Sequence, residues 1–176
     1  MSRQKWLTGF AVLIGFVLGV IFSNWHTPIA KVQAAEVMST DRQEILDLIS
    51  RYSYVWDAKD ADAWAALFKD DANWVSYRAG VLGTQLRSKA EILKWARERH
   101  QSQREQGIQT RHVQTNTLLE RVSDGSVKAE TMVTILGQQK DKPAAKITLT
   151  GTYRDRFEKT SSGWKFVRRE LYGDQK

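Results

Sequence analysis

Residues 51–77 read RYSYVWDAKDADAWAALFKDDANWVSY, and they are the most informative part of the chain for its fold. The stretch contains the end of an amphipathic helix, a short second helix that Asp60 can cap, and a strand over Trp74 to Tyr77. Upstream, apolar residues recur at steps of three and four from Ile45 to Trp56, which predicts one buried helix face. We expect this first helix to begin at the capping-box pattern Thr40-Asp41-Arg42-Gln43.

Downstream of this stretch, the pattern predicts one more helix and a run of strands. Gly80 and Gly83 mark a turn, and Ser88 with Glu91 forms a second capping-box pattern that opens a helix. From Thr110 onward the period of apolar residues changes to two. Strands are predicted near residues 110–121, 126–137, 145–158 and 164–172. Helices followed by a strand meander are typical of an α+β domain whose curved sheet packs on a helical layer and leaves a cavity beside the long helix.

The first 34 residues carry the pattern of an export signal. Two basic residues precede an apolar run from Trp6 to Phe22, and none of residues 1–34 is acidic. The run is long for a signal-peptide core and short for a spanning helix, so cleavage and membrane anchoring both stay open. We therefore expect residues 1–34 to be a signal peptide or membrane anchor, and residues 35–176 to be one domain in the periplasm or outside the cell.

Composition argues against several classes of function. Three of the 27 Lys and Arg residues lie in the leader, so the domain itself is only mildly basic, and its basic residues are dispersed among acids. Such a surface is not typical of nucleic-acid binding, and we expect no nucleic-acid partner. The chain has no cysteine, which excludes disulfides, thiol nucleophiles and thiolate metal sites. The domain's two histidines, His100 and His112, have no ligand-spaced third group, so we expect no metal and no cofactor.

Tyr52, Asp57 and His112 are the candidate catalytic residues. Tyr52 and Asp57 lie near the end of the first predicted helix, and His112 lies on a predicted strand within TRHVQTNTLLE, residues 110–120. Carboxylates and imidazoles have reference pKa values on either side of neutrality, so burial beside each other can set one as acid and the other as base. Asp57 could instead bond only the loop that follows its helix. However, a carboxylate is disfavoured at the negative end of a helix, so we expect a specific partner.

Four more residues are candidate substrate contacts. Gln114 and Asn116 alternate with His112 along the strand, so all three side chains should line one face. Tyr77, like Tyr52, could donate a hydrogen bond to an oxyanion that develops on the substrate. Trp56 fits either the core or the wall of a pocket.

The last predicted strand carries two adjacent arginines, Arg168 and Arg169. One of them could face inward and hold an acidic substrate. An exposed cross-strand pairing with Asp155 or Glu170 is the favoured interpretation.

The order of these elements resembles the SnoaL-like branch of the nuclear transport factor 2-like superfamily. The segments that carry the resemblance are YVWDAKDADAWAALFKDDANW, TRHVQTN and GTYRDRFEKTSSGWKFVRRE, which begin at residues 54, 110 and 151. The resemblance covers about residues 38–172. It implies an α+β cone in which a curved sheet wraps around a long N-terminal helix.

Resemblance to bile-acid dehydratase places Tyr52, Asp57 and His112 on that family's catalytic tyrosine, aspartate and histidine, with the same step of five residues from Tyr to Asp. Scytalone dehydratase, a relative, has a tyrosine directly before the aspartate and a second histidine on the next strand. This chain has Trp56 at the first of these positions, and the segment AETMVTIL offers only Thr131 and Thr134 as polar groups near the second.

The resemblance implies a cofactor-independent lyase, cyclase or isomerase that acts on a small apolar oxygenated molecule. In this hypothesis His112 is the base and Asp57 stabilises its protonated form. The alternative is a non-catalytic exported domain that binds a ligand or an assembly partner. Relatives are commonly dimers through the outer face of the sheet, so we expect a homodimer, and the threonine-rich strand from Lys146 to Thr152 would suit that face.

Overall fold

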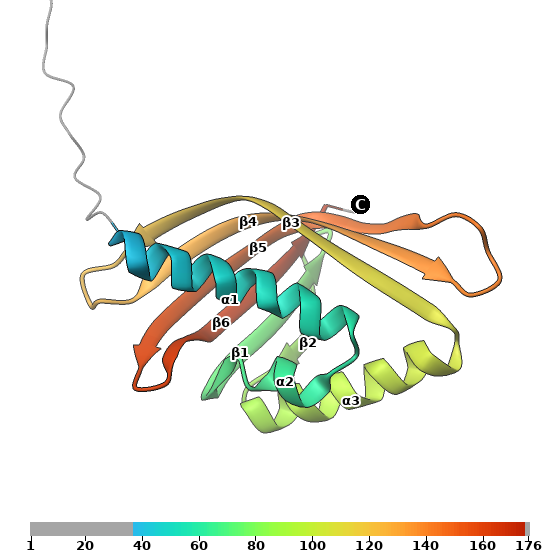
Figure 1. Cartoon of the computed structure of the whole chain (residues 1–176), viewed down its shortest axis with the longest axis horizontal. Coiled ribbons are helices and arrows are strands. Elements are labelled where there is room, and N and C mark those ends of the chain that lie inside the picture. Colours follow the sequence, from blue (N-terminus) through green and yellow to red (C-terminus); the bar gives the residue numbers. More distant parts are fainter. Residues whose placement is uncertain (1–36, 175–176) are drawn as a thin grey trace, which may run out of the picture. The chain divides into compact units, whose positions relative to one another are not determined.

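The computed structural model of the protein describes residues 37–174, and in this range it has three helices and six strands (Figure 1). The helices are α1 (Ser39–Asp57), α2 (Ala61–Ala65) and α3 (Lys89–Glu105). The strands are β1 (Phe68–Arg78), β2 (Val81–Leu86), β3 (Ile108–Arg121), β4 (Val127–Gln139), β5 (Lys146–Thr160) and β6 (Gly163–Gly173).

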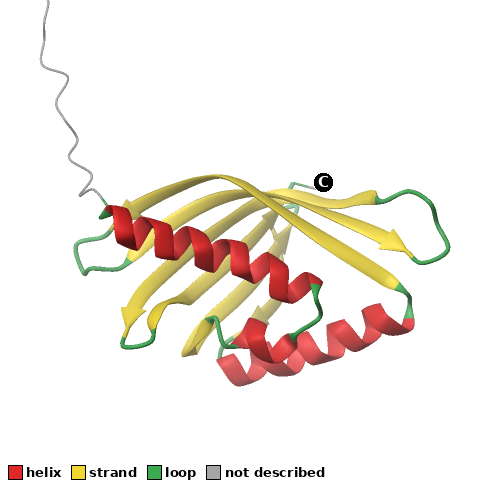
Figure 2. Cartoon of the chain, viewed as in Figure 1, coloured by secondary structure: helices red, strands yellow, loops and turns green. Residues whose placement is uncertain are grey.

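The strands form one mixed sheet in the order β2-β1-β6-β5-β4-β3. Strands β3 to β6 follow one another as an antiparallel meander, and β1 is added to β6 in parallel. The three helices lie on one face of this curved sheet, where α1 packs on β3 and β6, and α3 packs on β1 and β3 (Figure 2). The predicted α+β fold, with a curved sheet around a long first helix, is therefore confirmed.

The core lies between α1 and the inner face of the sheet. The apolar face of α1 that the three- and four-residue steps predict is buried, from Ile45 through Tyr52 to Trp56. It meets the aromatic side chains Tyr153, Phe157 and Phe166 of the sheet, among others. Full burial of a large apolar side chain contributes about 1.5–3 kcal/mol to the stability of the fold. This one helix face therefore supplies much of the free energy that holds α1 on the sheet.

Two of the three predicted helix caps form as expected. The Asp60 carboxylate accepts a hydrogen bond from the backbone of Ala63 at 2.9 Å, and the Ser88 hydroxyl accepts one from the backbone of Glu91 at 3.2 Å. The predicted capping box at Thr40 is wrong. Helix α1 begins at Ser39 after Met38, which makes no side-chain cap, and the Gln43 amide bonds Asp47 instead.

Asp41 explains why the start of α1 needs no capping box. Its carboxylate accepts hydrogen bonds from Arg121 at 2.6 Å, Lys159 at 2.8 Å and the Trp164 indole at 3.2 Å. The first turn of α1 is therefore held by side chains of β3, β5 and β6. A negative charge in this first turn is also favoured by the helix dipole.

The turn at Gly80 is tighter than the sequence predicts, and Gly83 lies outside it. Ala79 and Gly80 both have positive φ, at 49° and 74°, as a two-residue hairpin turn requires, and β2 follows at once. Gly83 lies within β2, where a Cβ atom would come within 2.9 Å of the Ser76 hydroxyl. The four strands predicted after Thr110 are confirmed as β3 to β6, whereas β2 is a strand that the sequence pattern does not reveal.

The predicted signal or anchor, residues 1–34, lies outside the described residues. Between residues 37 and 174 no helix combines the length and the hydropathy that crossing a bilayer requires.

Candidate active site

A cavity of about 690 Å³ opens between the helices and the inner face of the sheet. Its aromatic lining residues come from α1, α3, β1 and β5 and include Tyr52, Trp56, Trp74, Trp95 and Tyr153. Trp95 lies with its ring centroid 5.4 Å from that of Trp56 and 4.9 Å from that of Trp74, so the three indoles form one continuous wall. A largely apolar wall with a few polar groups is typical of small-molecule sites.

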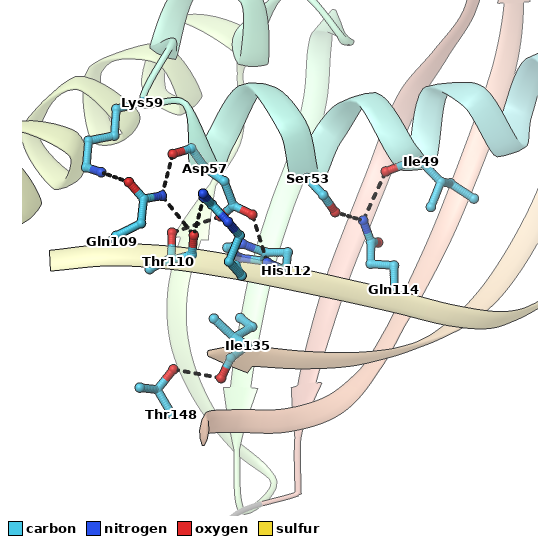
Figure 3. Close-up of polar contacts among 11 residues, drawn as sticks. Ile49, Ser53, Asp57, Lys59, Gln109, Thr110, His112, Gln114, Ile135 and Thr148 are labelled. Atoms are coloured by element: carbon cyan, nitrogen blue, oxygen red, sulfur yellow. Dashed lines mark hydrogen bonds and ion pairs between the residues drawn. The ribbon is translucent and has the colours of Figure 1, made fainter. Parts of the chain in front are cut away.

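Asp57 and His112 meet at one side of this cavity (Figure 3). Asp57 Oδ1 lies 2.8 Å from His112 Nδ1 and also accepts a hydrogen bond of 2.8 Å from the Thr110 hydroxyl. Asp57 Oδ2 accepts the backbone N–H of His112 at 2.8 Å. Both side chains are buried, at 6% exposed for His112 and 9% for Asp57. Because Nδ1 bonds Asp57, Nε2 is the ring nitrogen left for a ligand in the cavity.

The carboxylate of Asp57 is held in its ionised form. Burial by itself raises the pKa of Asp57, but hydrogen bonds from His112 and Thr110 and the charge of a protonated His112 outweigh it, so the net pKa lies below the usual value. An ionised carboxylate at this position favours the Nδ1–H tautomer of the imidazole and stabilises its protonated form.

The Tyr52 phenol belongs to a second buried residue that lines the same cavity. Its oxygen accepts a hydrogen bond from the Trp74 indole at 3.2 Å, and its ring centroid is 6.5 Å from that of His112. Burial raises the pKa of Tyr52, while the charge of Arg169 and hydrogen bonds from Trp74 and Tyr153 oppose this without cancelling it. The phenol therefore stays protonated at neutral pH. Since its oxygen accepts the Trp74 N–H, its own proton is available to a ligand.

A buried ion pair between Arg169 and Asp155 lies against the rings of Tyr52 and Tyr153. Arg169 Nε is 3.1 Å from Asp155 Oδ1, and both side chains are fully buried. The Arg169 guanidinium lies 3.9 Å from the ring centroid of Tyr52 and 3.8 Å from that of Tyr153. Burial raises the pKa of Asp155 to about 7, although the charge of Arg169 opposes the shift. The predicted cross-strand pairing with Asp155 is confirmed for Arg169, but the prediction that this pair is exposed is wrong.

A bulge in β6 is the reason that Arg169 points inward. Arg168 pairs with Arg156 and Phe166 with Phe157, so β6 has one residue more than β5 between these pairs. The extra residue reverses the alternation of side chains, because neighbouring strand residues point to opposite faces. Phe166 and Arg169 consequently share the buried face, and Arg168 lies outside and bonds Glu170 at 2.5 Å.

Gln114 and Asn116 are not among the residues that line the cavity. The Gln114 amide donates to the Ile49 carbonyl at 3.0 Å and to the Ser53 hydroxyl at 2.6 Å, so it joins β3 to α1 (Figure 3). Its oxygen accepts a bond from Arg169 at 2.6 Å. Asn116 has a φ of 54° at an irregularity of β3, and its side chain is exposed beside Met132. The expectation that both residues share the face of His112 is therefore wrong for Asn116.

Both aromatic contacts predicted, Trp56 and Tyr77, are among the residues that line the cavity, but their rings have different neighbours. The Tyr77 ring stacks on Tyr172 at a centroid distance of 4.8 Å, and Tyr172 follows directly after the cavity-lining Leu171 on β6. Neighbours on a strand point to opposite faces, so the Tyr77 phenol is directed away from His112. Tyr52 is the better placed of the two proposed phenol donors.

Sequence reasoning missed Thr110, Tyr153 and His100. Thr110 could have been found, because it lies two residues before His112 and shares its face. Tyr153 faces inward with the alternation of β5. His100 is fully buried on α3, with its ring centroid 4.4 Å from that of Trp56, and burial with the charges of Arg104 and Lys59 lowers its pKa to about 4. It is therefore a neutral packing residue behind the aromatic wall.

A family described as SnoaL-like domain matches residues 37–170. A comparison with curated protein sequences gives no match. Among residues 37–174 no three His, Cys, Asp or Glu side chains are grouped so that they could hold a metal ion.

Solved structures share the fold at low sequence identity. An NTF2-like protein with a cystatin-like fold from Novosphingobium aromaticivorans has a TM-score of 0.65 and 23% identity, over 77% of this chain and 82% of that one. ActVI-ORFA from Streptomyces coelicolor has a TM-score of 0.66 and 22% identity, over 76% and 96%. A protein assigned as a scytalone dehydratase from N. aromaticivorans has a TM-score of 0.64 and 23% identity, over 77% and 85%.

Proposed function

Because the chain belongs to the SnoaL-like domain family, which includes cofactor-independent dehydratases and cyclases, we propose that it is a cofactor-independent lyase, cyclase or isomerase. Its substrate is a small, largely apolar molecule that carries a carbonyl or hydroxyl group. The observation that carries this proposal is the Asp57 and His112 pair, joined at 2.8 Å and buried at the side of an aromatic cavity.

The roles of the residues follow from this pair. His112 Nε2 takes a proton from the carbon beside the substrate carbonyl, and Asp57 stabilises the imidazolium that forms. The electron pair left by the proton moves onto the carbonyl oxygen, to which the Tyr52 phenol donates a hydrogen bond. In a dehydration, the imidazolium then returns its proton to the leaving hydroxyl, and water departs as the double bond forms.

The alternative function is ligand binding or assembly without turnover. A purely binding cavity has no need for a carboxylate held ionised against an imidazole. Removing two such groups from water also carries a cost of several kcal/mol that only good hydrogen bonding offsets. The three bonds to Asp57 and its low pKa favour the enzyme.

The proposal is tested by proton exchange, which needs no knowledge of the product. We expect the full chain to catalyse deuterium uptake from D₂O at the carbon beside the carbonyl in a panel of apolar β-hydroxy ketones, followed by mass spectrometry. Asp57→Asn should lower the exchange rate by about 10²–10⁴-fold, because it removes the carboxylate that stabilises the general base His112, whose contribution is usually of this size.

Asp62→Asn is the matched control, because Asp62 is an exposed carboxylate on α2 that bonds Arg97 at 2.7 Å outside the cavity. This variant should keep the wild-type rate. Equal rates in wild type and Asp57→Asn would contradict the acid-base role. Binding of these ketones without any exchange would favour the non-catalytic alternative.

A further inference from the structure

The cavity carries an uneven distribution of charge. Its lining includes two arginines, Arg78 of β1 and Arg99 of α3, and none of the described residues that line it is Asp or Glu. Asp57 contacts the cavity only through His112 and Thr110, which cover its carboxylate. A ligand inside the cavity therefore meets two positive charges and no exposed negative one.

Arg78 and Arg99 are also free to bind a ligand. Both side chains are exposed, and neither forms a hydrogen bond, ion pair or ring contact with another described residue. Arg97, two residues before Arg99 on the same helix, is by contrast bonded to Asp62 at 2.7 Å. Arginine binds carboxylate, phosphate and sulfonate oxygens through its planar set of donors.

The positive charge continues beyond the cavity. A neighbouring groove of about 420 Å³ shares Gln103 and Ile108 with the cavity lining. Its own lining includes Lys59, Arg104 and Lys140 and no Asp or Glu among the described residues. An anion that approaches this end of the molecule is therefore attracted by several cations.

The cavity thus changes in character from its rim to its interior. The exposed rim carries Arg78, Arg99 and the apolar side chains of Val81 and Leu82, which are 69% and 51% exposed. The indoles of the aromatic wall follow, and the buried pair of Asp57 and His112 lies inside. An amphipathic molecule matches this sequence of surfaces.

We propose that the substrate of this cavity is an amphipathic anion, whose charged group binds Arg78 and Arg99 at the rim while its apolar body lies against the indole wall. This proposal rests on the proposed function, because it names the class of molecule that is brought to His112. It adds a preference for negatively charged substrates, which the pair of Asp57 and His112 does not itself define.

A matched pair of fluorescent probes tests the proposal. 1-Anilinonaphthalene-8-sulfonate is an apolar anion, and N-phenyl-1-naphthylamine is the same molecule without the sulfonate. Energy transfer from tryptophan to each probe reports binding near the indole wall of the full chain. The anion should bind more tightly than its neutral parent, and added salt should weaken only the anion.

The variants Arg78→Gln and Arg99→Gln should each raise the Kd of the anionic probe by about twofold to fivefold, the range expected for a solvated charge contact. The Kd of the neutral probe should change by less than a factor of about two. Arg97→Gln removes the same charge from the same helix outside the cavity and should leave both Kd values unchanged. Thermal unfolding followed by circular dichroism verifies that each variant is folded.

Three outcomes would overturn the inference: equal affinities for the two probes, equal effects of Arg97→Gln and Arg99→Gln, or loss of neutral-probe binding in the arginine variants. The proposed function fails differently. Asp57→Asn with unchanged proton exchange would refute acid-base catalysis even if the anionic probe still depended on Arg78 and Arg99.

Discussion

At the scale of single residues, the position of Asp57 at the end of α1 is the feature that the sequence predicts best. A carboxylate at the negative end of a helix needs a compensating partner, and His112 with Thr110 supplies three hydrogen bonds. The inward position of Arg169 could not be predicted, because the bulge in β6 adds one residue that strict alternation does not anticipate. The same limit applies to Asn116 at the irregularity of β3.

Tyr52 and Tyr153 should differ in their effect on the proposed reaction. Tyr52→Phe removes the phenol that donates to the substrate and should lower the rate by about 10²–10³-fold, as loss of one oxyanion donor does. Tyr153→Phe removes a phenol whose ring packs on that of Tyr52, at a centroid distance of 5.8 Å, and the loss should be about tenfold or less. Steady-state rates of both variants on one substrate measure the difference. Equal losses of rate would mean that both phenols are needed to the same extent. Tyr52 would then not be the single phenol that donates to the substrate.

At the scale of elements, helices and strands with regular periodicity are predictable and their irregular joints are not. The burial of α1 from Ile45 to Trp56 and the four strands of the meander follow from local pattern. The start of α1 does not, because Asp41 is held by partners more than 70 residues away in the sequence, among them Arg121 and Lys159. These tertiary contacts, and not the local capping pattern at Thr40, hold the start of α1.

Asp41 should make the attachment of α1 dependent on pH. The hydrogen bond from Lys159 lowers the pKa of Asp41 most, bonds from Arg121 and Trp164 add to this, and burial opposes it. Since the pKa is lower in the folded chain than the ordinary value of 3.8, the stabilisation is complete above that value and is lost as the pH falls through the folded pKa. Urea midpoints of wild type and Asp41→Asn should therefore differ at pH 7 and converge in strong acid.

The exposed Asp47 on the same helix supplies the control for this prediction. Asp47→Asn also removes one carboxylate from α1, yet Asp47 bonds only the neighbouring Gln43. Its urea midpoint should follow that of wild type at both pH values. A constant difference between wild type and Asp41→Asn across the acid range would show that packing, and not charge, is the contribution of Asp41.

At the scale of the whole molecule, the described residues form one buried core with the cavity beside it. The core runs from Ile45 on α1 to Leu171 on β6, and every residue that lines the cavity also falls between these limits. The sequence predicts where this core begins, because its periodic elements start after the leader, but the shape of the cavity depends on how the sheet curves around three helices. That curvature arises when the strands and helices pack together, and no local sequence pattern predicts it.

The chain shortened to residues 37–176 should consequently fold alone, with a single cooperative unfolding transition and the same probe affinities as the full chain. The physical reason is that the described core, from Ile45 to Leu171, and Val37, which packs against it, all lie within the shortened chain, so the truncation removes none of these side chains. Differential scanning calorimetry and sedimentation velocity measure the transition and the homogeneity of the sample. If the shortened chain aggregates while the full chain in detergent unfolds cooperatively, then residues before 37 contribute to the stability of the domain.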